Sequence, residues 1–302
     1  MPLHPQAEAY VAQYPSDLGV DPATLDLAAI QEMRAQDGFA TQRGPLTRLP
    51  FVRDESADGV PIRIYRADRG DDPLPVLVYF HGGGFVFGSV RRNDAFGRDL
   101  ALRTGAVVVS AEYRLAPEHA FPAAAEDAWS VVRDVFARPA FYQSNGRVAV
   151  MGDSAGGNLA AVAAWQARDA GLTLAHQVLL YPVLDAAMDT PSYRTYAKGF
   201  GLDAAEMAWF LRQYGGDPLD PRLSPLRLAS CSGLAPATVV TAECDVLCDE
   251  GERYGSRLAA AGVPVVTRRF GGAVHGFAGL PGLFDQAAEA RELVAARLRE
   301  AW

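Results

Sequence analysis

A single serine stands between two glycines in Gly152-Asp153-Ser154-Ala155-Gly156, where the apolar run 148–151 gives way to an alanine-rich stretch. A strand that feeds directly into a helix needs a very tight turn, and the residue at its apex is driven toward a positive φ. Glycine two positions before and after the serine removes side chains that would collide there. In this strand–turn–helix context, the G-x-S-x-G pattern predicts that Ser154 is a nucleophile above the carboxyl edge of a sheet. The alternative is a plain glycine-serine turn between a strand and a helix.

Three consecutive glycines follow another apolar run, in the segment HGGGFVFG at residues 81–88. A dinucleotide-binding G-x-G-x-x-G would need glycine at position 87, where Phe87 stands. Acyl transfer, in contrast, needs bare backbone N–H groups around the oxygen that becomes negative in the tetrahedral intermediate. We expect Gly83 and Gly84 to donate from this loop, joined by the N–H of Ala155.

A serine nucleophile needs a base, and the sequence has five histidines. His4 lies in the N-terminal tail, His176 opens an apolar strand, His81 belongs to the glycine loop and His119 sits in a polar corner. His275 remains, in the loop GGAVHGFAGL between the last predicted strand and the last predicted helix. We therefore predict His275 as the base, with a surface position on a flexible loop as the alternative.

Three aspartates could orient the imidazole of His275. Asp245 comes two residues after the run ATVVTAE, at the carboxyl end of a predicted strand, and keeps the chain order serine, aspartate, histidine. Asp249 lies just before a predicted helix, where a carboxylate more often caps the helix. Asp185 ends the run QVLLYPVLD and is the main alternative. We predict Asp245 as the acid.

An alternation of short apolar runs and longer amphipathic segments has to position these residues. Near-continuous apolar strands separated by helices indicate an α/β fold with a mostly parallel sheet covered on both faces. Ligands bind at the carboxyl ends of such strands. The predicted strands are 60–67, 74–80, 106–113, 147–152, 176–183, 237–243 and 263–270, and the predicted helices are 91–104, 122–137, 155–170, 250–261 and 283–300.

Two segments fall outside this alternation, residues 1–45 and about 186–225. In the first, Asp21-Pro22 predicts a helix start. In the second, Asp203 and Glu206 have capping-box spacing. We therefore divide the chain into an N-terminal cap segment, 1–45, and a catalytic domain, 46–302, that carries a cap insertion. The two segments either form a lid over the strand ends or merely pack on the core, and we expect the lid.

Apolar side chains near the glycine loop and in the insertion are expected to contact a substrate. They are Phe85, Phe200, Met207 and Phe210.

Composition excludes several partners. The net charge is −8 and opposite charges are interspersed over 302 residues, which argues against a nucleic-acid or anionic-membrane partner. No apolar run approaches the roughly 20 residues that a membrane span needs. Three cysteines make a disulfide framework improbable, and Cys244 and Cys248 lack neighbours at zinc spacing. We expect a cytoplasmic protein without a secretory signal, a metal or an organic cofactor.

The segments HGGGFVFG, YRLAPEH, GDSAGGNLA, CDVLCDEGERYGSRLAAAGV and HGF resemble, in order and spacing, the bacterial hormone-sensitive-lipase-like branch of the α/β-hydrolase family. The resemblance runs from about residue 50 to the end, and MPLHPQ is similar to that family's cap. It implies a carboxylesterase that acts on a small ester, with Ser154, Asp245 and His275 as its triad and an oxyanion hole from Gly83, Gly84 and Ala155. It also leaves a homodimer possible. The family commonly has Asp-Pro-Leu at the acid, and here Val246 replaces the proline.

Two other functions stay open at this stage. Plant gibberellin receptors are similar to the family and bind a small hormone without a catalytic histidine, so a binding protein is one alternative. An amidase or lactonase that uses the same triad is the other.

Overall fold

The computed structural model describes residues 2–36 and 43–302. Within them, eight strands form one sheet in the order β1-β2-β4-β3-β5-β6-β7-β8. In this order, every neighbouring pair in the run β4-β3-β5-β6-β7-β8 is parallel, whereas β2 runs antiparallel to both β1 and β4. The strands are β1 (Phe51–Ala57), β2 (Val60–Arg66), β3 (Leu74–Phe80), β4 (Val107–Ala111), β5 (Ser144–Asp153), β6 (His176–Leu180), β7 (Ala237–Cys244) and β8 (Val265–Val274). This is the α/β-hydrolase architecture that the sequence predicts.

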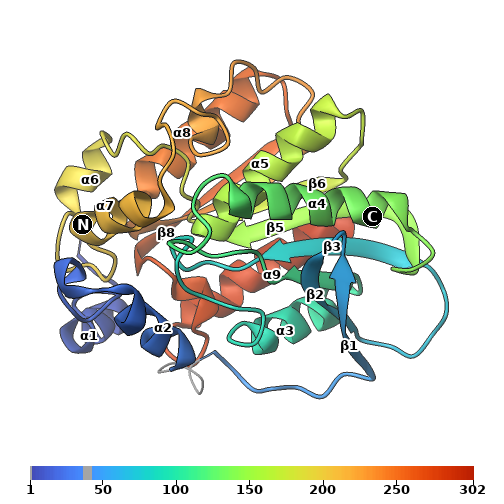
Figure 1. Ribbon diagram of the computed structural model, residues 1–302, viewed down its shortest axis with the longest axis horizontal. Coiled ribbons are helices and arrows are strands. Elements are labelled where there is room, and N and C mark those ends of the chain that lie inside the picture. The colour runs from blue at the N-terminus through green and yellow to red at the C-terminus, as the bar shows by residue number, and fades with distance from the viewer. Residues whose placement is uncertain (1, 37–42) are drawn as a thin grey trace.

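Helices cover both faces of the sheet (Figure 1). One face carries α4 (Ala123–Ala137), α5 (Ala155–Asp169) and α8 (Cys248–Ala260), and the other carries α3 (Asp94–Thr104) and α9 (Asp285–Ala301). Each face has its own hydrophobic core, because parallel strands are apolar on both sides.

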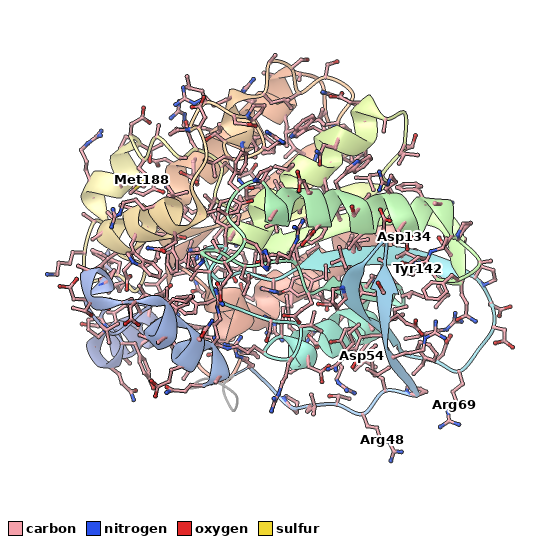
Figure 2. All side chains as sticks on the ribbon, viewed as in Figure 1. Arg48, Asp54, Arg69, Asp134, Tyr142 and Met188 are labelled. Carbon is pink, nitrogen blue, oxygen red and sulfur yellow. The ribbon has the colours of Figure 1, made fainter. Side chains whose placement is uncertain are left out.

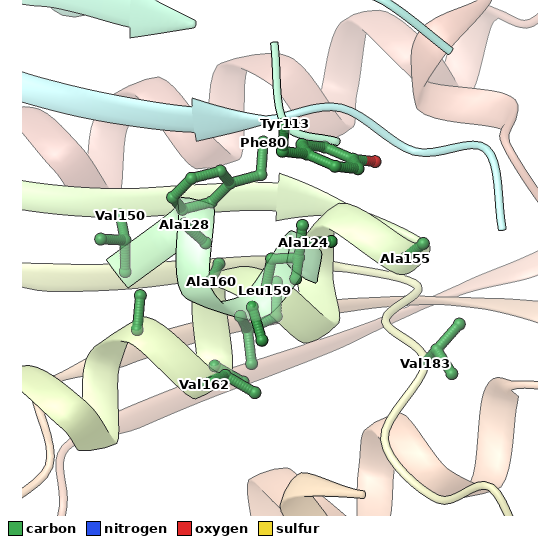
Figure 3. Close-up of a cluster of buried hydrophobic side chains, with 14 of the residues drawn as sticks. Phe80, Tyr113, Ala124, Ala128, Val150, Ala155, Leu159, Ala160, Val162 and Val183 are labelled. Atoms are coloured by element: carbon green, nitrogen blue, oxygen red, sulfur yellow. The ribbon is translucent and has the colours of Figure 1, made fainter. Parts of the chain in front are cut away.

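Small side chains let two of these helices approach the sheet closely. Ala124 and Ala128 of α4 lie near Ala160 of α5, over Phe80 and Val150 of the strands (Figure 3). All are completely buried. The alanine-rich stretch after Ser154 is therefore a packing surface, which fixes α5 and with it the turn that carries the serine.

The N-terminal segment and the insertion meet at one end of the sheet (Figure 1). The first contains α1 (Pro5–Gln13), the 3₁₀ turn η1 (Pro22–Thr24) and α2 (Leu27–Ala35); the second contains α6 (Pro191–Thr195), α7 (Ala204–Tyr214) and the 3₁₀ turn η2 (Pro225–Arg227). The backbone N–H of Asp17 donates to Gly201 O at 3.0 Å. The buried carboxylate of Glu206 accepts from the N–H groups of Leu18, at 2.8 Å, and Asp203, at 2.8 Å.

Two local predictions need correction. Asp21-Pro22 starts only the single turn η1, and the helix proper begins at Leu27, where Asp26 accepts from Ala29 N at 2.8 Å. His4, which the sequence places in the N-terminal tail, caps α1 there. The sequence prediction also missed β1, an edge strand with several exposed polar residues and no apolar run.

The described surface mixes charges. Exposed Arg48 and Arg69 point outward at separate places (Figure 2). The exposed Asp54 forms an ion pair with Arg63. Its carboxylate accepts from Arg63 Nε at 2.6 Å. Among the residues that the structure describes, no helix combines the length and apolar character that crossing a membrane requires.

Candidate active site

Strand β5 passes directly into α5 at the serine, as the pattern predicts. Ser154 has φ +56° and ψ −120°, a conformation that L-residues rarely adopt. A Cβ on Gly152 would lie 2.0 Å from Gly156 O, and one on Gly156 would lie 2.0 Å from Phe80 O. Both flanking positions therefore require glycine for steric reasons, and the turn holds Ser154 at the carboxyl edge of the sheet.

Two hydrogen bonds connect three side chains that are far apart in the sequence. His275 Nε2 lies 2.9 Å from Ser154 Oγ, and His275 Nδ1 lies 2.7 Å from Asp245 Oδ2. All three residues are buried, and Asp245 also accepts from the N–H of Leu247 at 3.0 Å. The structure thus brings the predicted nucleophile, base and acid into one chain of contacts.

The surroundings of His275 differ in part from the predicted loop at residues 271–280. β8 continues through residues 271–274 and ends at Val274, so that His275 follows the strand directly. A register shift between Ala242 and Cys244 interrupts the pairing with β7. Gly271 and Gly272 therefore belong to the strand, and His275 is attached directly to the sheet.

Burial and charge act in opposite directions on His275. Burial lowers its pKa, but the charge and hydrogen bond of Asp245, together with the charges of Asp17 and Asp153, outweigh this effect. The pKa of His275 is therefore raised above 6.5. The imidazolium that forms when the ring accepts a proton is stabilised in this position.

The two rival aspartates have other partners. Asp185 forms an ion pair with Arg227 at 3.0 Å. Asp249 lies in the first turn of α8 and accepts from Ser192 N at 2.8 Å. Both carboxylates therefore have hydrogen-bonding partners other than the imidazole of His275.

Of the remaining histidines, two are kept neutral by burial. The pKa of His81 is lowered to about 4, and its ring stacks on Tyr113 with 4.4 Å between centroids. The pKa of His176 is likewise lowered to about 4, and its Nε2 lies 2.8 Å from Thr238 Oγ1. His81 therefore shapes the glycine loop, as its sequence position suggests.

The glycine loop turns sharply beside Ser154. Gly83 has φ +126° and Gly84 has φ +60°. A Cβ on Gly84 would lie 2.3 Å from the ring of Phe210, so that glycine at this position makes room for α7. In the described part of the chain, the N–H groups of Gly83, Gly84 and Ala155 donate to no protein acceptor.

A cavity of about 270 Å³ opens onto Ser154 and His275. Of the four side chains expected to contact a substrate, Met207 and Phe210 line this cavity, whereas Phe85 and Phe200 do not. Phe85 instead stacks on Tyr214 with 4.0 Å between ring centroids, and Phe200 packs on Tyr196. The positive φ of Phe85 accompanies this placement in the core.

Sequence reasoning missed most of the N-terminal contribution to this cavity. The lining includes Tyr10, Asp17, Leu18, Met33 and Arg43, which come from a region identified only as a cap. Tyr181 was also missed: it lies inside the predicted strand 176–183 but directly follows the observed strand β6, and its ring centroid lies 4.9 Å from that of His275.

Asp17 brings a carboxylate from the N-terminal segment to the cavity, whose lining also includes the charged residues Arg43, Arg92 and Asp153. It is accessible from the cavity, yet the surrounding protein desolvates it enough to raise its pKa to about 7. Within residues 2–36 and 43–302, no group of histidine, cysteine and acidic side chains has an arrangement that could hold a metal ion.

Comparisons with known proteins agree with this geometry. Residues 77–279 match a family described as having the alpha/beta hydrolase fold, and residues 27–118 match the carboxylesterase family. The carboxylic ester hydrolase LipN of Mycobacterium tuberculosis is 44% identical over 280 residues, which are 87% of this chain and 73% of LipN. An ethyl acetate hydrolase of Pseudomonas putida is 38% identical over 80% of this chain and 78% of its own.

A solved structure is similar over the whole length. An esterase of Pyrobaculum calidifontis has a TM-score of 0.89 and 40% identity, and 99% of each chain is covered. The family matches extend over the serine turn, the glycine loop and the histidine. The chain belongs to the hormone-sensitive-lipase-like carboxylesterases of the α/β-hydrolase family.

Proposed function

We propose that the protein is a serine carboxylesterase that hydrolyses short-chain esters through an acyl-enzyme intermediate. The observation that carries the proposal is the continuous contact Ser154–His275–Asp245, with distances of 2.9 Å and 2.7 Å. Esterase names among relatives of 38–44% identity support the reaction class.

The first half of the reaction transfers the acyl group to the serine. His275 Nε2 accepts the proton of Ser154 Oγ while that oxygen attacks the ester carbonyl carbon. Asp245 holds the imidazole tautomer and stabilises the imidazolium. His275 then gives the proton to the alcohol oxygen, the bond from the acyl carbon to that oxygen breaks, and the alcohol leaves.

The second half restores the enzyme. Water loses a proton to His275 and attacks the acyl carbon, the carboxylic acid leaves, and Ser154 recovers its proton. In both tetrahedral intermediates, the negative oxygen would accept from the N–H groups of Gly83, Gly84 and Ala155. Such fixed donors favour the transition state over the neutral ester carbonyl.

The N-terminal segment and the insertion form the lid in this proposal. The backbone contact of Asp17 with Gly201 and the Glu206 contacts fasten one segment to the other. Leu18, Met33, Met207 and Phe210 give the cavity an apolar wall for a short acyl or alcohol group.

The proposal is tested with Ser154→Ala on p-nitrophenyl butyrate. Loss of a triad member typically lowers kcat by about 10⁴ to 10⁶. We expect the folded variant, checked by circular dichroism, to lose essentially all turnover. A purified variant that keeps a tenth of wild-type kcat would show that Ser154 is not the nucleophile.

A cytoplasmic location and a homodimer are further parts of the proposal. All three cysteines are buried free thiols, which suits a reducing compartment. Strand β8 is a sheet edge that a second copy could extend. Light scattering of the purified protein distinguishes a mass near 32.3 kDa from twice that value.

A further inference from the structure

The glycine loop beside Ser154 has an unusual backbone that must be held from outside. Gly83, Gly84 and Phe85 are three consecutive residues with positive φ, and Phe85 has a side chain that disfavours this conformation. The loop's own bonds are few: Val86 N and Phe87 N both donate to Gly83 O, at 3.0 Å and 2.7 Å. Strain of this kind persists only where neighbouring groups fix it.

The beginning of the loop is fixed by the sheet domain. Asp153 Oδ1 accepts from Gly82 N at 3.1 Å and from Tyr79 Oη at 2.6 Å. The hydroxyl of Tyr113 donates to His81 O at 2.6 Å. These contacts connect the loop to the serine turn and to the segment after β4.

The end of the loop is fixed by one side chain from the N-terminal segment. Arg34, in the last turn of α2, donates through Nε to Val86 O at 2.8 Å and through Nη2 to Ala116 O at 2.6 Å. Ala116 N in turn donates to Phe85 O at 2.9 Å. Arg34 therefore joins two backbone segments that also bond to each other.

Glu118 orients the arginine. Its carboxylate accepts from Arg34 Nη1 at 2.8 Å and from Nη2 at 3.0 Å, and it also accepts from Gln31 at 3.2 Å. The Arg34 contact holds the pKa of Glu118 at about 2, so that this carboxylate is ionised throughout the neutral range. A planar guanidinium can serve the carboxylate and both carbonyls at once, whereas an ammonium group lacks this fork.

We propose that Arg34 is a positioning residue for the oxyanion hole. It fixes the far end of the glycine loop so that the N–H groups of Gly83 and Gly84 stay oriented toward the negative oxygen of the tetrahedral intermediate. The inference rests on the proposed function for its kinetic consequence, although its structural part does not. It also gives the segment YRLAPEH a role, because Ala116 and Glu118 are the residues that hold Arg34 in place. The lid and the oxyanion hole are thereby coupled through one side chain.

The test compares Arg34→Met with Arg34→Lys and Glu118→Gln. Misaligned donors weaken binding of the transition state more than binding of the ester, so we expect Arg34→Met to lower kcat about tenfold or more while KM changes less than about twofold. Arg34→Lys should recover only part of kcat. Glu118→Gln should keep most of it, because Arg34 and both carbonyl contacts remain.

Arg168→Met is the matched control. Arg168 also donates to two loop carbonyls, Ser230 O at 2.8 Å and Ser232 O at 3.0 Å, and to a neighbouring carboxylate, and its side chain is about as exposed as that of Arg34 (23% against 19%). It does not line the cavity. We expect its kcat to match that of the wild type even if stability falls.

Amide hydrogen exchange gives a readout that does not need turnover. Arg34→Met should speed exchange at Val86 and Phe87, whose N–H groups depend on the loop conformation, and leave the Arg168→Met protein unchanged there. If the wild-type protein lacks esterase activity, the proposed function fails, while this measurement still tests whether Arg34 fixes the glycine loop. Unchanged exchange at residues 82–90, or equal kcat losses in the Arg34 and Arg168 variants, would overturn the inference.

Discussion

At the scale of single residues, Asp245 differs from its two rivals in what each carboxylate contacts. Asp245 reaches the imidazole at 2.7 Å, Asp185 pairs with Arg227, and Asp249 accepts from Ser192 N. We expect Asp245→Asn to lower kcat by on the order of 10⁴ with little change in KM. Asp185→Asn should instead lower the free energy of unfolding by about 1–3 kcal/mol. Kinetics and urea unfolding of both asparagine variants check this, and an inactive Asp185→Asn enzyme would assign the acid to the segment that follows β6.

The pH dependence is set by His275. The ring must be neutral to act as a base, so kcat/KM should rise as pH passes the pKa of His275 in the free enzyme. Because burial lowers that pKa less than Asp245, Asp17 and Asp153 together raise it, the rise should lie above the pH 6.5 of an ordinary histidine.

Asp17→Asn tests the electrostatic part of this argument. The substitution removes a negative charge that favours the imidazolium, so the midpoint of the kcat/KM profile should shift to lower pH. It also removes the titration of Asp17 itself, whose pKa is raised because the protein around the cavity displaces water from the carboxylate. Asp26→Asn, an exposed helix cap, serves as the control. A midpoint that stays in place or moves upward would contradict the assignment.

At the scale of elements, the sequence predicts apolar strands and long helices well and polar elements poorly. The six parallel strands each contain a run of β-branched or apolar residues, which is the signal of a doubly covered sheet. β1 is an edge strand with exposed polar residues and lacks that signal. The two-residue turn Asp58-Gly59, with φ of +49° and +88°, is a typical hairpin turn and could have revealed it.

The end of strand β8 matters because His275 follows it directly. Periodicity ended the last strand at 270, because the glycines at 271 and 272 resemble a loop. The structure extends β8 to Val274, with the N–H of Gly272 bonded to Glu243 at 2.8 Å. That contact comes from the neighbouring strand β7, so local sequence does not reveal it. The residue type and motif of His275, in contrast, are visible in the sequence.

The joint between the two cap segments depends on Glu206. Its buried carboxylate accepts from Leu18 N, Asp17 N and Asp203 N at 2.8–3.3 Å, so it serves both the N-terminal segment and the start of α7. Glu206→Ala would leave the buried N–H of Leu18 without this acceptor, at a cost of about 1–3 kcal/mol, whereas Asp17 N keeps its bond to Gly201 O. We expect a raised KM, with a smaller effect on kcat, and faster proteolysis in residues 2–36.

Glu206→Gln separates the shape of this side chain from its charge. It keeps one acceptor oxygen and should fall between wild type and Glu206→Ala in both measurements. If Glu206→Ala unfolds the whole protein in a single transition at low urea, with KM unchanged under native conditions, the cap segments are a part of the core rather than a lid.

At the scale of the whole molecule, the cavity is assembled from parts that sequence distance separates. Its lining combines Tyr10 and Asp17 of the N-terminal segment, Phe210 of the insertion and Leu280 after β8. Motifs identify residues whose local backbone is special, such as Ser154, but a cavity wall is defined by which segments meet. This is why Ser154, His275 and Asp245 lie together, while Phe85 and Phe200, chosen as apolar side chains in the glycine loop and the insertion, lie outside the cavity lining.

The size of this cavity limits the substrate. A volume of about 270 Å³, closed on one side by the two cap segments, is small for a ligand site, since such sites span roughly 300–1,000 Å³. Each buried methylene contributes about 0.8 kcal/mol only while the cavity accepts it. We expect kcat/KM for p-nitrophenyl esters to rise about fourfold per methylene from acetate and then to fall beyond roughly eight acyl carbons.

The measurement is a series from acetate to palmitate, at concentrations where each ester is monomeric, with emulsified triolein as a bulky comparison. The Met207→Ala variant provides an internal control, because it enlarges the cavity from the insertion side without touching the triad. Its optimum should move to longer chains, since the removed side chain leaves room for additional methylenes. If palmitate is the best substrate of the wild type, or if triolein is hydrolysed efficiently, then the cap segments open widely enough that the volume of the closed cavity does not determine chain length.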